Sequence, residues 1–170
     1  MSSNLLLIKE RPQDSVAVEK LMNTSFGPER FGLTVYKLRQ VCPPIADLSY
    51  IAIDNRGVVQ GSIRFWPVKI ANSDLKVIIL GPLAVAFDQQ GQGVGKALIA
   101  RSLDEATHQA FDLCLVVGDQ RLYTGFGFSN ATQMGLKLPG WVDPARFQMK
   151  ELRKGCLNQN FSGSDVLPYV

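Results

Sequence analysis

The pattern of apolar and polar positions divides the chain into short alternating segments and longer segments with helical spacing. Strand-like alternation covers residues 5–10, 48–53, 58–70, 112–117, 128–137 and 146–152. Helical spacing covers residues 15–25, 30–41, 97–110 and, briefly, 120–124. This order of elements predicts an α/β (α+β) protein in which strands and helices pack around one core.

Residues 76–87 form the most informative strand. Apolar side chains occupy both of its faces, which is typical of a strand in the middle of a sheet. Gly81 and Pro82 nevertheless interrupt it, and a proline has no N–H to donate to a neighbouring strand. The pattern therefore predicts a central strand with a bulge, where backbone groups are left for another partner.

Length and charge narrow the possibilities. We expect 170 residues to form a single domain, with residues 154–170 as a loosely packed tail. The net charge of +3 comes from scattered basic residues, which argues against nucleic acid as a partner. Three cysteines and one histidine without metal-ligand spacing argue against a metal site. Apolar stretches are too short for a membrane helix, so we expect a cytoplasmic protein.

A cluster of glycines lies between the central strand and the helix 97–110. Such a turn presents backbone N–H groups at a helix N-terminus, where they bind phosphate groups. The spacing excludes a P-loop, because only three residues separate Gly91 from Gly95 and Ala97 follows Lys96. It also excludes the dinucleotide fingerprint, whose third glycine would fall on Lys96 or Leu98.

The segment Gln90-Gly91-Gln92-Gly93-Val94-Gly95 resembles the Q/R-x-x-G-x-G/A motif of the GCN5-related N-acetyltransferase (GNAT) superfamily. Tyr123-Thr124-Gly125-Phe126-Gly127-Phe128 is similar to the family's Y-x-x-x-G-F signature. Leu80 to Val85, the glycine turn and Gly118-Asp119 look like the bacterial YhbS-type branch. The resemblance covers nearly the whole chain. It implies a mixed, mostly antiparallel central sheet with helices on both faces and a bulged, splayed central strand.

The resemblance also implies the cofactor and the chemistry. The cofactor would be acetyl-CoA, and the reaction would move its acetyl group to a primary amine of a small molecule or a peptide by direct attack. The backbones of Leu83, Ala84 and Val85 would pair with the pantetheine arm, with an oxyanion donor near Leu83. The pyrophosphate would be held by Gln90, Gly91, Gln92, Gly93, Val94, Gly95 and Lys96. Tyr123 occupies the position of the general acid that protonates the leaving thiolate.

Some features of the site stay open. No acidic residue occurs between Val77 and Phe87, so we expect water-mediated deprotonation of the amine, with Asp119 as a helix cap rather than a base. By resemblance the acceptor pocket lies between the first two helices and the loop 138–144, with candidate residues Phe26, Arg30, Phe31 and Trp141. The alternative function is a non-catalytic acyl-CoA-binding or sensor module. A homodimer and a longer acyl group are both compatible with the sequence.

Overall fold

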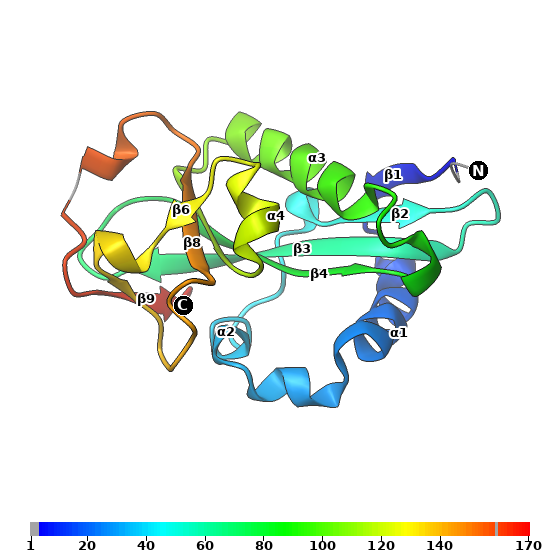
Figure 1. Cartoon of the computed structure of the whole chain (residues 1–170), viewed down its shortest axis with the longest axis horizontal. Helices are drawn as coiled ribbons and strands as arrows, with labels where there is room; N and C mark the ends of the chain where they lie inside the picture. The colour runs from blue at the N-terminus through cyan, green and yellow to red at the C-terminus, as the bar shows by residue number, and fades with distance from the viewer. Residues whose placement is uncertain (1–3, 159) are drawn as a thin grey trace.

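The computed structural model describes residues 4–158 and 160–170, and the described residues form one mixed sheet (Figure 1). Its main strand order is β1-β2-β3-β4-β5-β8-β6, with β9 paired to β3 and β7. Only the β4–β5 and β7–β9 pairs are parallel. The strands are β1 Leu6–Lys9, β2 Tyr50–Ile53, β3 Val59–Ile70, β4 Val77–Val85, β5 Leu113–Val117, β6 Ser129–Asn130, β7 Leu136–Lys137, β8 Phe147–Glu151 and β9 Ser164–Pro168.

Helices cover both faces of the sheet (Figure 1), as the resemblance implied. Helix α3 packs on one face through residues such as Leu98 and Ile99, and α1 packs on the other through Val18 and Met22. Burying these apolar side chains against the sheet is the main stabilising contribution to the fold. The helices are α1 Ser15–Phe26, α2 Thr34–Lys37, α3 Val94–His108 and α4 Gln120–Thr124.

The interruption of the central strand is confirmed. Strand β4 pairs with β3 on one side, but the register shifts between the pairs Ile63↔Leu83 and Phe65↔Leu80. An extra residue therefore lies in β4 at Gly81-Pro82. On its other side β4 pairs with β5 only as far as Leu80↔Val116. Beyond this pair, the edge of β4 has no neighbouring strand and is open to another partner.

Two predicted elements are wrong in their extent. The helix expected over residues 30–41 is a 3-10 helix, Pro28–Gly32, followed by the short helix α2. Leu33 separates them because its backbone is extended, with φ −71° and ψ 146°. The strand expected over 128–137 is also divided, into β6 and β7. Between them Thr132–Met134 form a 3-10 helix, which ends at Gly135 with a left-handed φ of 87°.

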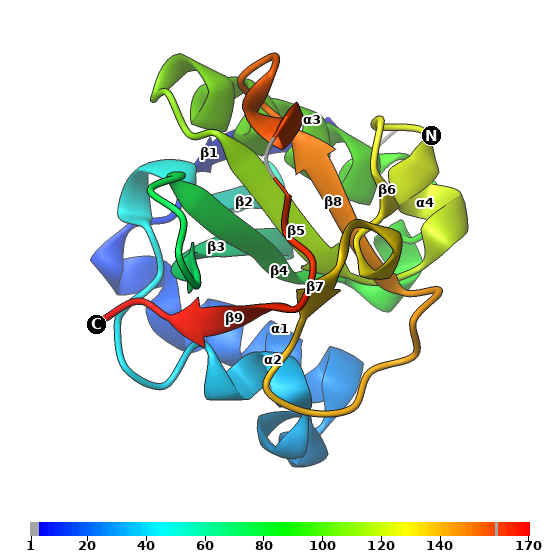
Figure 2. The same ribbon diagram turned by 90° about the vertical axis from the view of Figure 1, so that its left-hand side faces the viewer.

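The loosely packed tail expected for residues 154–170 is wrong for its described part. Strand β9 continues the sheet beside the end of β3, with Val166 opposite Ile70, and it also pairs with β7 (Figure 2). Phe161 and Val166 are buried in the same core cluster as Ile70. The segment has many polar residues and glycines, but the burial of Phe161 and Val166 and the pairing of β9 with β3 and β7 hold it in the fold.

Candidate active site

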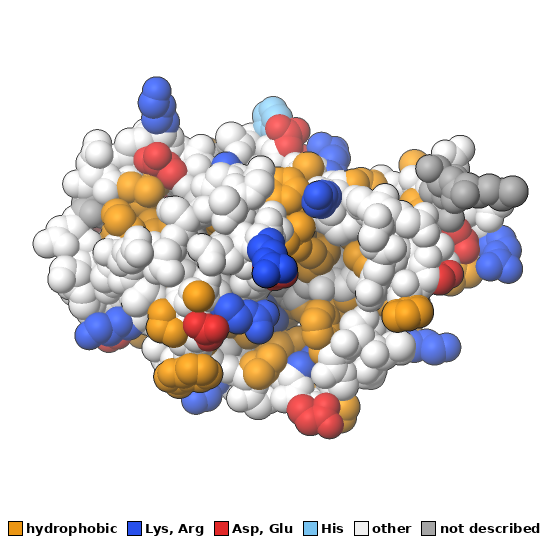
Figure 3. All heavy atoms as spheres, viewed as in Figure 1, with side chains coloured by type: hydrophobic (Ala, Val, Ile, Leu, Met, Phe, Trp, Pro, Cys, Tyr) orange, Lys and Arg blue, Asp and Glu red, His pale blue; other side chains and the backbone are white. Residues whose placement is uncertain are grey.

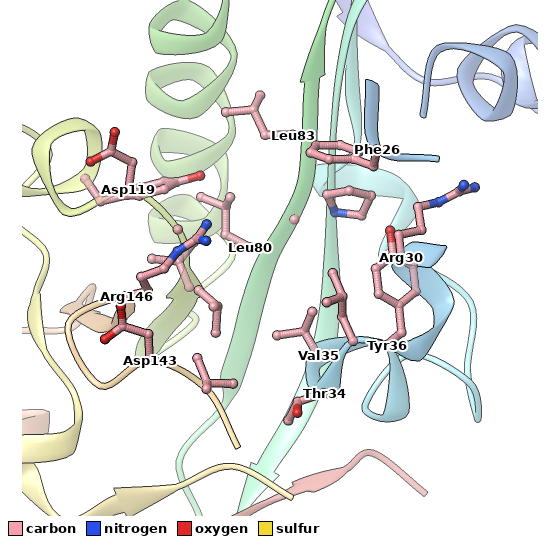
Figure 4. A pocket seen from close by; sticks show the side chains of 18 of the residues that line it. Phe26, Arg30, Thr34, Val35, Tyr36, Leu80, Leu83, Asp119, Asp143 and Arg146 are labelled. Atoms are coloured by element: carbon pink, nitrogen blue, oxygen red, sulfur yellow. The ribbon is translucent and has the colours of Figure 1, made fainter. Parts of the chain in front are cut away.

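A pocket of about 560 Å³ opens where β4 and β5 separate, and Figure 3 shows a hollow on this face of the molecule. Figure 4 shows Arg30 and Tyr36 on one side of β4 and Asp119 and Arg146 on the other. The pocket thus joins the N-terminal helical segment to the loops after β5 and before β8. It is lined by Phe26, Arg30, Leu33, Thr34, Val35, Tyr36, Arg39, Leu80, Gly81, Pro82, Leu83, Val116, Val117, Gly118, Asp119, Leu122, Tyr123, Trp141, Val142, Asp143 and Arg146.

Tyr123 reaches the pocket from α4. Asp119 begins this helix, and its carboxylate accepts a hydrogen bond from the backbone N–H of Arg121 at 2.8 Å, which confirms the predicted cap. The tyrosine is only 5% exposed, and its ring packs edge-on against Phe128 with centroids 5.4 Å apart. Burial raises the pKa of Tyr123 above its ordinary value, so the phenol is neutral at neutral pH.

Two cations oppose this pKa shift. The nearby positive charges of Arg146 and Arg39 lower the pKa of Tyr123, although burial outweighs them. Both arginines line the same pocket. A phenolate formed after proton donation would therefore have positive charge beside it, which reduces its cost in a buried site.

The glycine-rich turn lies beside the open edge of β4. Gly91 and Gly93 have positive φ values of 74° and 85°, which glycine adopts without a steric penalty. Helix α3 makes its first hydrogen bond from Ala97 N–H to Gly93 O, so the N–H groups before Ala97 have no partner within the helix. A Cβ on Gly95 would lie 3.6 Å from a methyl of Val85 and 3.7 Å from one of Leu83.

The residues expected to hold the cofactor are therefore brought together. Gln90 fastens the turn to the strand, because its side-chain amide donates to the backbone oxygen of Val85 at 3.1 Å. Gln92 donates to the backbone oxygen of Asp88 at 2.9 Å, while the side chain of Lys96 is exposed. Leu83 and Val85 are half-buried and Ala84 is buried. The turn and the open edge form one continuous surface suited to an extended ligand with a diphosphate.

Three of the four candidate acceptor residues line the pocket: Phe26, Arg30 and Trp141. Phe31 does not. Its ring is 56% exposed, packs edge-on against Tyr36, and lies under the guanidinium of Arg30 at 4.2 Å.

Arg30 and Arg64 are already engaged by groups within the chain. Arg30 donates to Glu19, to Asn23 and to the backbone oxygen of Gly27. Arg64 donates to Glu10 and Glu19. These donors hold α1 and the segment after it on the sheet, so they are not available to a ligand.

Three charged residues of the pocket, Arg39, Asp143 and Arg146, were not identified from the sequence. Arg39 fell within the residues expected to form a continuous helix, and Arg146 fell at the start of a strand. No motif or periodicity marks either position. Only contacts between segments far apart in the chain bring them together.

In residues 4–158 and 160–170, no group of His, Cys, Asp and Glu side chains is arranged to hold a metal ion. Within the same residues, no helix has the length and apolar character needed to cross a membrane. His108, at the end of α3, is exposed and lies outside the pocket.

Known proteins resemble the chain in sequence. Residues 46–130 match the acetyltransferase (GNAT) domain family, and this range holds β4, the glycine turn and Tyr123. The chain is 29% identical over 154 residues to YhbS of Escherichia coli K12, described as an uncharacterised N-acetyltransferase, with 91% of each protein covered. It is 35% identical over 86 residues to N-acetyltransferase family 8 member 2 of Rattus norvegicus, covering 47% of this chain and 38% of the rat protein.

Solved structures agree with these relatives. E. coli YhbS in complex with CoA superposes with a TM-score of 0.81 at 28% identity, covering 97% of this chain and 89% of that one. A GNAT acetyltransferase from Brucella melitensis in complex with acetyl-CoA superposes with a TM-score of 0.69 at 25% identity, covering 99% and 97%. With its bulged central strand, its glycine turn and the family match, the chain belongs to the GNAT family of N-acetyltransferases.

Proposed function

We propose that the chain transfers an acetyl group from acetyl-CoA to a primary amine, with Tyr123 as the general acid. The observation that carries this proposal is the open edge of β4. It runs from the glycine turn at the start of α3 to the pocket that contains Tyr123. The two structural relatives that contain CoA or acetyl-CoA have the same fold and support this choice of cofactor.

In the proposed complex, the turn Gln90 to Lys96 binds the diphosphate of acetyl-CoA through backbone N–H groups at the start of α3. The pantetheine arm pairs with the backbone of Leu83 to Val85, as an added strand would. The thioester then lies at the mouth of the pocket. A backbone N–H near Leu83 stabilises the negative charge that develops on the carbonyl oxygen.

The reaction is a direct displacement. The ammonium first loses a proton, and its nitrogen then attacks the thioester carbon, forming the C–N bond. The C–S bond breaks, and the departing thiolate takes the proton of the Tyr123 hydroxyl. The nitrogen loses its second proton, and the phenolate regains one from solvent. The net products are the acetamide, CoA as a thiol and one proton.

We propose that water molecules, rather than a protein carboxylate, accept the proton of the substrate ammonium. The carboxylate of Asp119 lines the pocket, but its oxygen is engaged in capping α4. An Asp119→Asn variant keeps an acceptor for the cap and removes the charge. We expect the pH profile of kcat/KM to keep its acid limb in this variant. Loss of that limb would identify Asp119 as the base and refute the water route.

The first experiment is a thermal-shift titration with acetyl-CoA and CoA, with ATP and NAD as controls. A ligand at 100 times its Kd adds about 2.7 kcal/mol to the stability of the folded state. Stabilisation by the two CoA compounds alone supports the cofactor assignment. CoA release with an amine then supports an enzyme, whereas binding without turnover of any amine favours the acyl-CoA sensor.

Homodimer formation and a cytoplasmic location stay predictions. Light scattering of the purified protein checks the first of them.

A further inference from the structure

Arg39 is a buried cation without an acidic partner in the described part of the chain. Its side chain lines the pocket, yet the residue is only 8% exposed. Its Nε is buried and makes no hydrogen bond, and no ion pair to Arg39 occurs among the described residues. Burying an unpaired charge is costly, so such a group indicates a partner that is supplied from outside.

The position of Arg39 is set by its surroundings. Leu38, the preceding residue, is fully buried in the core, and the backbone N–H of Arg39 donates to the oxygen of Tyr36 at 3.0 Å. The guanidinium lies over the ring of Tyr36 at 4.7 Å. Its Nη2 would be 2.9 Å from a Cβ on Gly81, which places it against the bulge of β4. Burial lowers the pKa of Arg39 to about 10, so it remains charged at neutral pH.

Two other buried arginines, Arg30 and Arg64, differ from Arg39 because each forms an ion pair with a carboxylate. Arg30 is 3% exposed and pairs with Glu19, while Arg64 is 8% exposed and pairs with Glu10 and Glu19. The chain therefore supplies carboxylates to the arginines that hold its helices. Among the described residues no carboxylate pairs with Arg39, although Arg30 and Arg39 both line the pocket.

The acidic residues that line the pocket, Asp119 and Asp143, already accept hydrogen bonds from nearby backbone N–H groups. Asp119 caps α4, and Asp143 accepts a hydrogen bond from the backbone N–H of Ala145 at 3.0 Å. The phosphates of CoA are assigned to the turn at Gln90 to Lys96, which contributes no residue to the pocket lining. An anion that reaches Arg39 would thus have to come with the second substrate.

We propose that Arg39 binds a carboxylate of the amine substrate, so that the acceptor is a small amine carrying a carboxylate, such as a free amino acid. This inference rests on the proposed transferase function. A planar guanidinium pairs with a carboxylate through two parallel hydrogen bonds, which fixes the orientation of the amine as well as its affinity. The cavity of about 560 Å³ is of the size that holds a small molecule.

The decisive comparison uses matched substrates on the unmodified protein. A panel of amino acids is compared with the corresponding amino acid amides. Because the amide also lowers the pKa of the amine, each kcat/KM is calculated for the concentration of free amine. We expect kcat/KM to be about 10- to 100-fold higher for the acids, because a hydrogen bond to a charged group is worth more than one to a neutral group. Equal rates for acids and amides, or faster reaction of the amides, would overturn the proposal.

Variants then assign the effect to Arg39. In Arg39→Met the preference for acids over amides should disappear. Any loss of rate that comes from removing the positive charge beside Tyr123 is shared by acids and amides and does not change their ratio. Arg146→Met is the matched control, since Arg146 also lines the pocket, and it should keep the preference. An equal loss with acids and amides in Arg39→Met would instead mean that Arg39 supports Tyr123 or the bulge. Loss of the preference only in Arg146→Met would place the carboxylate at Arg146. Either result refutes the assignment to Arg39.

Failure of this inference is distinguishable from failure of the proposed function. If neither acetyl-CoA nor CoA raises the melting temperature, the transferase assignment itself is wrong. If both raise it and CoA is released with amines without regard to a carboxylate, only the acceptor class is wrong. The comparison of substrates on the unmodified protein needs no variant, so it remains decisive even if Arg39→Met does not fold.

Discussion

At the scale of single residues, the surroundings of Tyr123 limit what its hydroxyl can do. Burial raises its pKa, which rules out a resting phenolate and leaves the neutral phenol as a proton donor. The thiolate of CoA is a stronger base than water and can take that proton as the C–S bond breaks. Edge-on contact with Phe128 restrains the ring, so the hydroxyl is held in one place.

The Tyr123→Phe variant removes the hydroxyl and keeps the ring and its packing. We expect kcat to fall by about 10²- to 10⁴-fold, the usual contribution of a general acid. The Kd for acetyl-CoA, measured by calorimetry, should stay unchanged because the glycine turn is intact. An unchanged kcat would remove Tyr123 from the mechanism.

A substitution at Gly118 tests whether catalysis depends on the position of the Tyr123 ring. A Cβ at this residue would lie 2.4 Å from Cε2 of Tyr123, so an alanine forces the ring to move. We expect Gly118→Ala to lower kcat by about 10-fold or more, since small misplacements of a catalytic group are costly. Gly125→Ala is the control, because its nearest contact is an ordinary 3.6 Å to Leu122 O. Similar kinetics in both variants would contradict this account.

At the scale of elements, a network of charged side chains fastens α1 and the 3-10 helix Pro28–Gly32 to the sheet. Arg64 on β3 donates to Glu10 and Glu19, and Glu19 also accepts from Arg30. Glu10 follows β1, so four segments of the chain meet at this point. The network positions the wall of the pocket that carries Arg30 and Arg39.

Glu10→Gln leaves the Arg64 guanidinium with less compensating charge in a nearly buried place. The side chains of Arg64 and Glu10 are 10% and 11% exposed, and we expect a loss of about 1–3 kcal/mol in the free energy of unfolding. Asp47→Asn is the control, because its pair with Lys9 is exposed and worth about 1 kcal/mol or less. Urea denaturation measures the free energy of unfolding of both variants. Equal losses in Glu10→Gln and Asp47→Asn would refute a special role for the network.

Asp112 connects the starts of β4 and β5 to the segment after β8. Its ionisation makes the free energy of unfolding depend on pH. Burial raises its pKa, but hydrogen bonds from the Arg153 side chain and the Lys76 N–H outweigh this and hold the pKa below its ordinary value. The stabilisation is therefore complete above about pH 3.9, the value for an unfolded Asp, and is lost as pH falls through the folded-state pKa.

In Asp112→Asn this contribution is absent. We expect the unfolding free energy of the variant to change less than that of the original protein between neutral and acid pH. Urea denaturation at several pH values checks this, with Asp74→Asn as an exposed control. Parallel pH profiles for the original protein and Asp112→Asn would contradict the prediction.

At the scale of the whole molecule, the C-terminal segment closes one end of the core. Phe161 and Val166 pack with residues of β3, β5 and β8, and β9 extends the sheet beyond β2. The segment lies away from the pocket, to whose lining it contributes no residue. It is therefore expected to support stability rather than catalysis.

Phe161→Ala tests this role. We expect a loss of about 3–5 kcal/mol, because it removes a buried aromatic side chain and leaves a cavity. Leu167→Ala, at a site that is 42% exposed, should cost much less. A single unfolding transition in both proteins is expected if the chain is one domain, as we propose. If the original protein instead shows a separate, early transition that Phe161→Ala removes, the C-terminal segment folds on its own.

Much of the element order follows from local signals. Strand alternation, helical spacing and capping act over a few residues, and they predicted β1 to β5, α1, α3, α4 and β8 to within a few positions. The break in β4 follows from Pro82, which lacks an N–H, and the phosphate-binding turn follows from its glycines. These properties belong to the residues themselves, so they can be read before any tertiary contact is known.

Tertiary structure decided the rest. Leu33 ends a helix that the apolar spacing would have continued. Phe161 and Val166 hold the C-terminal segment in the core, and β9 pairs with β3 and β7. No local pattern in the sequence distinguishes Arg30 from Arg39, yet Arg30 pairs with Glu19 while Arg39 lies over the ring of Tyr36 with no acidic partner among the described residues. Whether a charge is paired depends on residues far away in the chain, because distance and burial set its energy, and neither is encoded locally.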